Sequence, residues 1–238
     1  MNIAIIFAGG VGKRMSNKAK PKQFLELHGK PIIVYTLEAF ENCKEIDKIV
    51  VVCVKSHMEI LKKFIHKFGL EKVDNIVPGG ATGFESIYNG LSALEKDADS
   101  NDIVLLHDGV RPFIDNKMIK ENINSVKQYG NAITAVPAIE GMMISDDGIS
   151  VENIPERKQL YASKAPQSFR YDLIFDLYKR AKADNFEPIE SAHLCQHYGV
   201  KLYMVESSYS NIKITTPMDY YVFRALYEAQ ENSQLVGY

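Results

Sequence analysis

The sequence predicts an α/β fold in which a mostly parallel sheet is flanked by helices. Two observations carry this prediction: short continuous runs of Val, Ile and Leu, and amphipathic stretches of helical period between them. Continuous apolar runs are typical of strands buried on both faces, and their alternation with helices is typical of parallel sheets. Because 238 residues lie within the range of one α/β core, we expect a single domain over residues 1–238.

The expected strands and helices follow one another along the chain. Strands are predicted at residues 3–7, 49–54, 103–107, 133–136 and 202–205, and helical patterns cover residues 31–42, 56–68, 84–96, 116–129, 171–183 and 217–230. Two of the helix starts have the spacing of a capping box, Thr82 with Glu85 and Thr216 with Asp219. In the second, Pro217 occupies a first helical position, where a missing N–H is tolerated.

Residues 139–161 depart from this alternation. Short extended pieces surround Asp146-Asp147-Gly148, a hairpin-type turn signal, so we expect a β-arm that projects from the sheet. A projecting arm needs a surface to lie against, because an isolated two-stranded hairpin is marginally stable in water. A second subunit is the simplest candidate for that surface.

Composition and charge disfavour several classes of partner. The chain is 46% hydrophobic and 24% charged, which is ordinary for a folded globular protein. With 28 Lys and Arg against 30 Asp and Glu, the net charge of -2 gives no general attraction to nucleic acid or to an anionic membrane. No apolar stretch approaches the roughly 20 residues that span a bilayer. We therefore expect neither a nucleic-acid partner nor membrane insertion.

The cysteines and the N-terminus indicate a cytoplasmic protein. Cys43, Cys53 and Cys195 are scattered and odd in number, so we expect buried thiols in a reducing compartment. The apolar run at the N-terminus has no cationic segment before it, and glycines follow it at once. This arrangement predicts a strand rather than a signal peptide.

A glycine-rich loop with clustered cations follows the first expected strand. Glycine lets backbone N–H groups approach an anion, and Lys and Arg supply charge and donors. The loop departs from the P-loop pattern because Arg14 stands where Ser or Thr is required, and from the dinucleotide fingerprint because Met15 stands where the third glycine would be. A tight strand-to-helix corner is the alternative, but crowded like charges favour a polyphosphate site. The loop glycines and cations are Gly9, Gly10, Gly12, Lys13, Arg14, Lys18, Lys20 and Lys22.

Several motifs in the chain resemble those of the cytidylyltransferases that act on polyol phosphates. The group includes the methylerythritol 4-phosphate enzyme and the ribitol 5-phosphate enzyme, and the resemblance covers nearly the whole chain. It implies a Rossmann-like nucleotidyltransferase fold, a homodimer joined through β-arms, CTP as substrate and Mg²⁺ as cofactor. The matching stretches are residues 7–15, 21–23, 79–86, 106–113, 155–157, 166–169 and 209–217.

The resemblance also implies roles for individual residues. As catalytic residues, Arg14 and Lys22 would neutralise the triphosphate and its transition state, and Lys213 would bind near the α-phosphate. Asp108 would hold or orient the Mg²⁺-triphosphate complex, with a helix cap as the alternative. Arg157 would reach from the arm into the partner's site to bind the acceptor phosphate. Arg111 is expected either at the acceptor or in a structural ion pair. The expected nucleotide-binding residues are Ala8, Gly9, Gly10, Gly12, Gly80, Ala81, Ser86 and Gly109.

Departures from the family pattern gather at the acceptor. Gly141, Ala165 and Ile189 stand where methylerythritol phosphate enzymes present threonine hydroxyls. A pocket built to hydrogen-bond a polyol discriminates by large factors, so the loss of these groups predicts a different acceptor. Glu190 replaces a common Asp, and Gly83 replaces a frequent Arg.

The triplet at residues 209–211 resembles the ribitol phosphate branch, because Ser210 stands where the other branch usually has Asp. We therefore expect transfer of CMP to an alditol phosphate for a surface polymer such as teichoic acid or capsule. Ribitol 5-phosphate is the first expectation, and glycerol phosphate or another alditol phosphate the next. Methylerythritol 4-phosphate as acceptor, or a non-catalytic nucleotide-binding paralogue, are the alternatives.

Overall fold

A seven-stranded sheet forms the centre of the molecule, in the order β5-β4-β1-β6-β8-β7-β9. The computed structural model describes residues 1–9 and 21–236, and the side chains up to residue 232. The predicted residues Gly10, Gly12 and Arg14 lie outside this part of the chain. The strands are β1 (Asn2–Ala8), β4 (Lys48–Cys53), β5 (Val73–Pro78), β6 (Ile103–Asp108), β7 (Asn131–Pro137), β8 (Tyr161–Arg170) and β9 (Met204–Glu206), and a separate pair is formed by β2 (Glu26–Leu27) and β3 (Lys30–Pro31).

The expectation of a mostly parallel sheet is confirmed, with one exception in its interior. β1 pairs in parallel with β4 and β6, β4 with β5, and β7 with β9. β8 lies between β6 and β7 and runs antiparallel to both. β8 pairs with β6 through Gln167–Arg170, and Gln167 pairs with Leu106 near the carboxyl end of β6.

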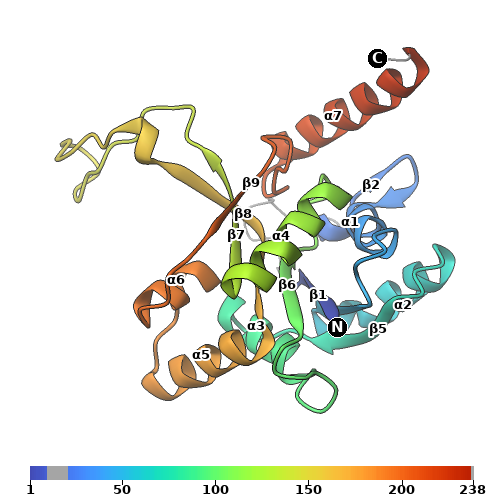
Figure 1. Cartoon of the computed structure of the whole chain (residues 1–238). Coiled ribbons are helices and arrows are strands. Elements are labelled where there is room, and N and C mark those ends of the chain that lie inside the picture. Colours follow the sequence, from blue (N-terminus) through green and yellow to red (C-terminus); the bar gives the residue numbers. More distant parts are fainter. Residues whose placement is uncertain (10–20, 237–238) are drawn as a thin grey trace.

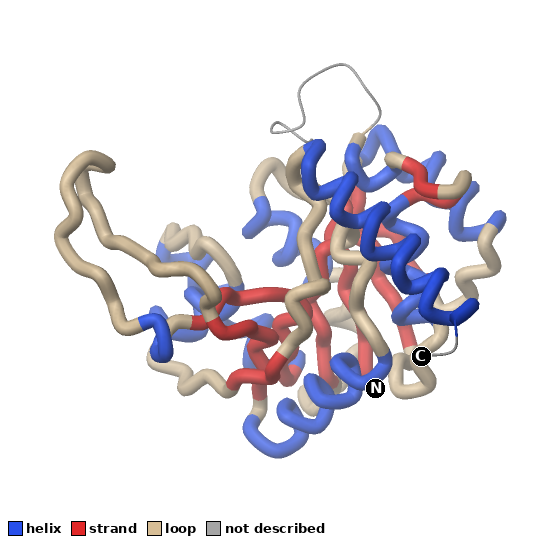
Figure 2. The backbone as a smooth tube through the Cα atoms, turned by 90° about the horizontal axis from the view of Figure 1, so that it is seen from above, coloured by secondary structure: helices blue, strands red, loops and turns tan. Residues whose placement is uncertain are grey.

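Helices cover both faces of the sheet (Figures 1 and 2). One buried cluster joins α1, α2 and α4 to the sheet, and a second joins α3, α5 and α6 to the opposite face. The helices are α1 (Ile32–Glu41), α2 (Met58–Lys67), α3 (Gly83–Ser92), α4 (Asn116–Tyr129), α5 (Tyr171–Asp184), α6 (Ser191–His197) and α7 (Pro217–Val236). Short 3-10 turns occur at Lys22–Phe24, Lys55–His57 and Arg157–Gln159.

Both predicted helix starts are N-capped by their threonine, and the second is a complete capping box. Thr82 Oγ1 accepts the N–H of Glu85 at the start of α3, and Thr216 Oγ1 accepts that of Asp219 at the start of α7. Asp219 returns the contact, since its Oδ2 accepts the N–H of Thr216 at 2.7 Å. Glu85 instead reaches one residue further back, where its Oε2 accepts the N–H of Ala81 at 2.5 Å. The carboxylate of Glu85 thus holds the loop before α3 in place.

α3 lies unusually close to the sheet at Gly90. A Cβ added there would lie 2.8 Å from Cγ2 of Ile5 and 2.9 Å from Cγ2 of Val52. Both neighbours are fully buried strand residues. Glycine is therefore required by the close approach of helix to sheet.

The last strand begins later than predicted, at Met204 rather than Leu202. The side chain of Asn131 provides the reason. Its Nδ2 donates to the carbonyl of Lys201, and its Oδ1 accepts the N–H of Tyr203 at 3.0 Å. A side chain thus binds the backbone groups that a longer strand would have paired.

The predicted arm projects from the sheet between β7 and β8 (Figures 1 and 2). Its two sides meet in one isolated bridge, Ile144 to Asn153, so it is a looser hairpin than a continuous ladder. The turn is ordered by Asp147, whose Oδ1 accepts the N–H groups of Ile149 and Ser150 at 2.7 Å each. These bonds lower the pKa of Asp147. Gly148 adopts a φ of 72°, as the turn signal predicted.

The remaining expectations about the chain concern its thiols and apolar segments. All three cysteines are free and buried, as predicted. Burial raises the pKa of Cys53 to about 11 and that of Cys195 to about 12, so both remain thiols at neutral pH. Within the described residues, none of the helices combines the length and the apolarity needed to cross a membrane.

Candidate active site

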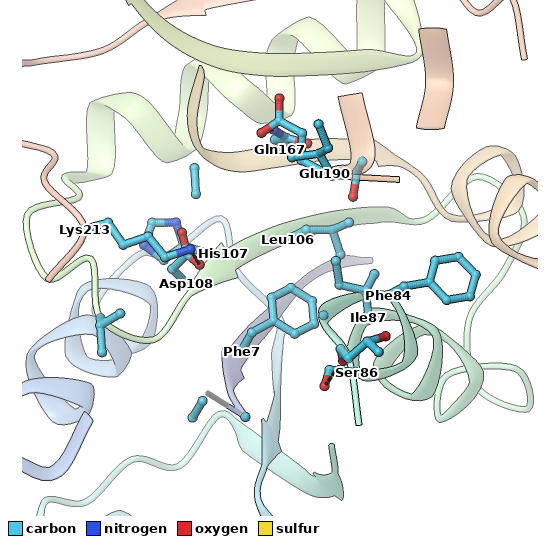
Figure 3. A pocket seen from close by; sticks show the side chains of 18 of the residues that line it. Phe7, Phe84, Ser86, Ile87, Leu106, His107, Asp108, Gln167, Glu190 and Lys213 are labelled. Atoms are coloured by element: carbon cyan, nitrogen blue, oxygen red, sulfur yellow. Dashed lines mark hydrogen bonds and ion pairs between the residues drawn. The ribbon is translucent and has the colours of Figure 1, made fainter. Parts of the chain in front are cut away.

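A pocket of about 700 Å³ opens at the carboxyl ends of β1 and β6. The chain passes to opposite sides of β1 on its way to β4 and β6, and such a reversal point at the carboxyl edge of a parallel sheet is where α/β proteins bind ligands. Figure 3 shows three groups around Phe7 and Leu106: Ser86 with Phe84 and Ile87, Asp108 with Lys213, and Gln167 with Glu190. Each group comes from a different part of the sheet edge.

The first group is a backbone wall formed by residues 79–87. Ser86 Oγ donates to the carbonyl of Thr82 at 2.9 Å and accepts the N–H of Gly80 at 3.2 Å. A Cβ at Gly80 would lie 2.2 Å from Cβ of Glu85, so only glycine fits there. The predicted residues Gly80, Ala81 and Ser86 therefore line one compact turn at the start of α3.

Gly83 also lines this wall, where the family pattern often has Arg. Nothing lies within 4 Å of the position that its Cβ would take. A side chain therefore has open space at this point of the pocket.

The second group is built around the carboxylate of Asp108, the last residue of β6. Lys213 Nζ lies 2.6 Å from Oδ1, and Arg111 Nε lies 2.8 Å from Oδ2. Burial by itself would raise the pKa of Asp108, but the charges and hydrogen bonds of Lys213 and Arg111 lower it to about 2. The carboxylate is therefore ionised at neutral pH and fixes both cations at the pocket.

Arg111 contributes to the structure as well as to the pocket lining. Its Nη1 donates to the carbonyl of Asn211 at 2.9 Å, and only 8% of the residue is exposed. The ion-pair alternative for Arg111 is thus observed, while its contact with an acceptor remains a prediction. His107 lies beneath this group, fully buried, and its Nε2 donates to the carbonyl of Arg111. Burial lowers the pKa of His107 to about 4, so its ring is neutral.

The third group lies on β8 and on the segment before α6. Glu190 Oε2 accepts hydrogen bonds from Ser163 Oγ at 3.0 Å and from Gln167 Nε2 at 2.9 Å. The predicted acceptor residues Ala165 and Ile189 also line this side. Lys164 lies on the same strand, and burial together with the charge of Arg111 lowers its pKa. This wall offers hydrogen-bonding groups and a cation to a ligand.

The other predicted residues divide between the pocket and the arm. Ala8, Gly9 and Lys22 line the pocket. The ideal Cβ position of Gly109 lies 3.0 Å from the carbonyl oxygen of Phe7, so glycine is required by packing against β1. Gly141 and Arg157 lie on the arm outside this pocket, and Arg157 Nη1 donates to the carbonyl of Ile139 at 3.3 Å.

The donor set at Asp108 fits Mg²⁺ only together with a phosphate ligand. The described residues contain no group of three His, Cys, Asp or Glu side chains suited to hold a metal. Mg²⁺ commonly binds one or two carboxylates, several waters and substrate phosphates. Each carboxylate oxygen of Asp108 accepts one bond from a cation and keeps a second lone pair.

Sequence reasoning missed the groups that complete the third wall. Ser163 and Lys164 carry no motif of their own, and Gln167 belongs only to one of the stretches that match the family. The available signal was their common strand, which the apolar pattern did not reveal because residues 161–168 contain Ser, Lys, Pro and Gln. Gln167 also orients Glu190, which the sequence marks only as a replacement of the common Asp.

The chain matches known proteins in sequence over nearly its whole length. Residues 2–228 match the family model IspD: 2-C-methyl-D-erythritol 4-phosphate cytidylyltransferase. The ribitol-5-phosphate cytidylyltransferase of Vibrio parahaemolyticus serotype O3:K6 is 47% identical over 238 residues, the whole of both chains. The 2-C-methyl-D-erythritol 4-phosphate cytidylyltransferase of Clostridium botulinum (strain 657 / Type Ba4) is 40% identical over 218 residues, 92% of this chain and 93% of the relative.

The fold is shared with solved structures. The crystal structure of 4-diphosphocytidyl-2C-methyl-D-erythritol synthase from Anaerococcus prevotii DSM 20548 superposes with a TM-score of 0.81 at 31% identity, over 95% of this chain and 97% of that one. The predicted Rossmann-like nucleotidyltransferase fold is therefore confirmed. With its sequence matched over residues 2–228 and its fold matched over nearly its full length, the chain belongs to the IspD family of cytidylyltransferases.

Proposed function

We propose that the protein transfers CMP from CTP to an alditol phosphate, ribitol 5-phosphate first among them, and releases pyrophosphate. The observation that carries the proposal is a single pocket with a backbone wall, a cationic centre and a polar wall that lacks the threonines at Ala165 and Ile189. The 47% identity to a ribitol-5-phosphate cytidylyltransferase supports this acceptor, against 40% for a methylerythritol phosphate enzyme. The reaction would take place in the cytoplasm, and its CDP-alditol product would serve the synthesis of a surface polymer.

In the proposed reaction, an oxygen of the acceptor phosphate attacks the α-phosphorus of CTP. The new P–O bond replaces the bond from the α-phosphorus to the bridging oxygen, and that oxygen leaves with pyrophosphate. No general base is needed, because a phosphate monoester has a second pKa near 6 and is largely a dianion at neutral pH. The enzyme must bring two polyanions together and stabilise the charge that develops on the leaving oxygen.

The residues of the pocket suit that electrostatic task. Lys22 and Lys213 lie at the pocket with Arg111 and Lys164, and the carboxylate of Asp108 fixes two of these cations. Asp108 would hold Mg²⁺ jointly with oxygens of the triphosphate, and the ion would offset the charge of the phosphates. Arg14 would add a further cation from the glycine loop.

The arm supports a homodimer as part of the proposal. Its large apolar side chains are exposed to an extent that is costly for an isolated chain. A second copy that covers them would also carry Arg157 and Gly141 toward a neighbouring pocket. Sedimentation as a monomer at micromolar concentration would remove this part of the proposal. The exposed fractions are 66% for Ile139, 54% for Met142, 66% for Met143, 90% for Ile149 and 65% for Ile154.

The experiment that tests the function is pyrophosphate release with CTP, Mg²⁺ and a panel of polyol phosphates. The panel contains ribitol 5-phosphate, glycerol phosphates, arabinitol and mannitol phosphates, and methylerythritol 4-phosphate. Release with an alditol phosphate, and only with CTP, is the expected result. Preference for methylerythritol 4-phosphate would assign the isoprenoid reaction instead. Binding of CTP without turnover on any acceptor would indicate a non-catalytic paralogue.

Lys22→Ala supplies the first test of a residue within this function. We expect turnover to fall by roughly two or more orders of magnitude, because one positioned charge at the phosphates is removed. The folded state and oligomer mass should be unchanged. The exposed Glu59→Gln variant, on α2 and outside the pocket, serves as a control for purification. Unchanged turnover of Lys22→Ala would refute the role of this lysine at the triphosphate.

A further inference from the structure

We infer that Glu190 is the residue that recognises the hydroxyl groups of the polyol acceptor, held in position by Ser163 and Gln167. This inference rests on the proposed function and extends it to the residue that sets acceptor specificity. The starting observation is that the Glu190 carboxylate lines the pocket and that only one of its two oxygens, Oε2, accepts hydrogen bonds from the described residues.

The orientation of Gln167 fixes which group faces Glu190. Gln167 is 6% exposed, and its Oε1 accepts the backbone N–H of Ala192 at 2.9 Å. A backbone N–H can only donate, so the amide oxygen must lie on that side. The amide nitrogen is thereby directed toward Glu190 Oε2 at 2.9 Å and toward Ser163 Oγ at 3.0 Å.

Ser163 closes the arrangement into a triangle. Its hydroxyl accepts from Gln167 and donates to Glu190 Oε2 at 3.0 Å. Glu190 Oε2 therefore receives two donors from the protein, while Oε1 has no hydrogen-bond partner among the described residues. A carboxylate oxygen that is held in place and open to the pocket is an acceptor for hydroxyl groups.

The position of Glu190 in the chain argues against a purely local role. It stands at the N-cap of α6, where short side chains such as Ser, Asp or Asn stabilise a helix. Its side chain makes no capping bond and turns instead to β8. The longer side chain thus serves the pocket rather than the helix.

The distribution of charge gives the acceptor a direction. Lys164, Arg111 and Lys213 line the pocket around Asp108, and this set carries a net positive charge that suits phosphate groups. A carboxylate repels phosphate but accepts hydrogen bonds from neutral hydroxyls. An alditol phosphate therefore places its phosphate at the cations and its hydroxyl chain at Glu190. Ala165 and Ile189, which lack hydroxyls, leave this recognition to Glu190.

The test compares Glu190→Gln, Glu190→Ala and Glu190→Asp with the wild-type protein in binding and in turnover. Binding is measured by calorimetry with α,β-methylene CTP present, so that the bond to be broken is replaced by an inert one. The ligands are ribitol 5-phosphate, or the polyol phosphate that the wild type binds best, and 2-hydroxyethyl phosphate, which keeps the phosphate and has a single hydroxyl. Glu95→Gln makes the same chemical change at an exposed side chain outside the pocket.

We expect Glu190→Gln and Glu190→Ala to weaken binding of the polyol phosphate at least about tenfold, with the same rise in its KM. Binding of 2-hydroxyethyl phosphate and the KM for CTP should change less than about twofold. Glu190→Asp, which keeps the charge, should recover part of the loss. The Glu95→Gln variant should match the wild type.

Three results would overturn the inference. Equal losses for both phosphates would show a structural role, a changed KM for CTP alone would place Glu190 at the nucleotide, and no loss would show that the hydroxyls are recognised elsewhere. A wild-type protein that binds a polyol phosphate but releases no pyrophosphate refutes the proposed function, while the binding ratios still decide the role of Glu190. A wild-type protein that binds no polyol phosphate refutes both.

Discussion

Asp108→Asn is expected to lower both the free energy of unfolding and the turnover of the proposed reaction. The change removes the charge that Lys213 and Arg111 share, and leaves the Arg111 side chain, which is 10% exposed, without a counter-charge. A buried cation that loses its partner is costly because it is desolvated without compensation. Lys213 is 41% exposed and contributes less, since water screens its charge.

The magnitude follows from the pKa of the carboxyl group. A fall from 3.8 to about 2 corresponds to about 2 kcal/mol of differential interaction with the ionised form. The partial exposure of Asp108, 24% of its side chain, keeps the expected loss near 2–3 kcal/mol, at the lower edge of values for broken buried pairs. For a chain of this size, that loss lowers the melting temperature by about 5–10 °C.

The assay is thermal and urea unfolding at pH 7 and again at low pH. Because the folded pKa of Asp108 is depressed, its contribution is present above the unfolded value of 3.8 and is lost as pH falls toward 2. The gap between wild type and Asp108→Asn should therefore narrow in that window. Glu59→Gln, which breaks an exposed pair with Lys62, should leave the melting temperature close to that of the wild type, because water screens an exposed pair. A melting temperature within about 1 °C of wild type would refute the reasoning.

Two further predictions concern buried positions around the site. His107→Gln should remove one contribution to the pH dependence of stability. The buried wild-type ring stays neutral down to about pH 4, whereas the unfolded ring takes up a proton near pH 6.5. The unfolding free energy of the wild type should therefore fall by about 1.4 kcal/mol per pH unit between pH 6.5 and 4 because of this residue. Urea unfolding at pH 5 and 6 measures this slope, and an unchanged slope would contradict the neutral buried ring. Gly90→Ala should lower stability by about 1–2 kcal/mol, because overpacking against Ile5 and Val52 exceeds the gain in helix propensity. A raised melting temperature would show that α3 can move away without cost.

The sequence predicted the strands that are buried on both faces and missed those that depend on their neighbours. β1, β4 and β6 are continuous apolar runs, so their composition alone predicts that they are buried strands. β8 contains Ser163, Lys164, Pro166 and Gln167, and it is a strand because β6 and β7 pair with it from both sides. β5 is an edge strand with polar residues and gives an equally weak pattern.

The candidate site divides in the same way. Lys22, Ser86, Asp108 and Lys213 belong to local motifs, and all of them line the pocket. The triangle of Ser163, Gln167 and Glu190 joins two segments that neither periodicity nor motif spacing brings together. Arg157 on the arm lies outside the pocket of its own chain, and its role depends on the proposed second copy.

The position of β8 also determines where the protein can change in length. Residues 139–160 form a loop held by one bridge, so insertions there alter the reach of the arm and little else. The strand that follows is aligned by its pairing with Ile103–Leu106 on one side and with β7 on the other. One residue inserted between Ser163 and Gln167 would turn Ser163 to the opposite face of the sheet relative to Gln167. Insertions in the arm therefore leave the pairing of β8 unchanged, while the number of residues from Ser163 to Gln167 is fixed by the bond between their side chains.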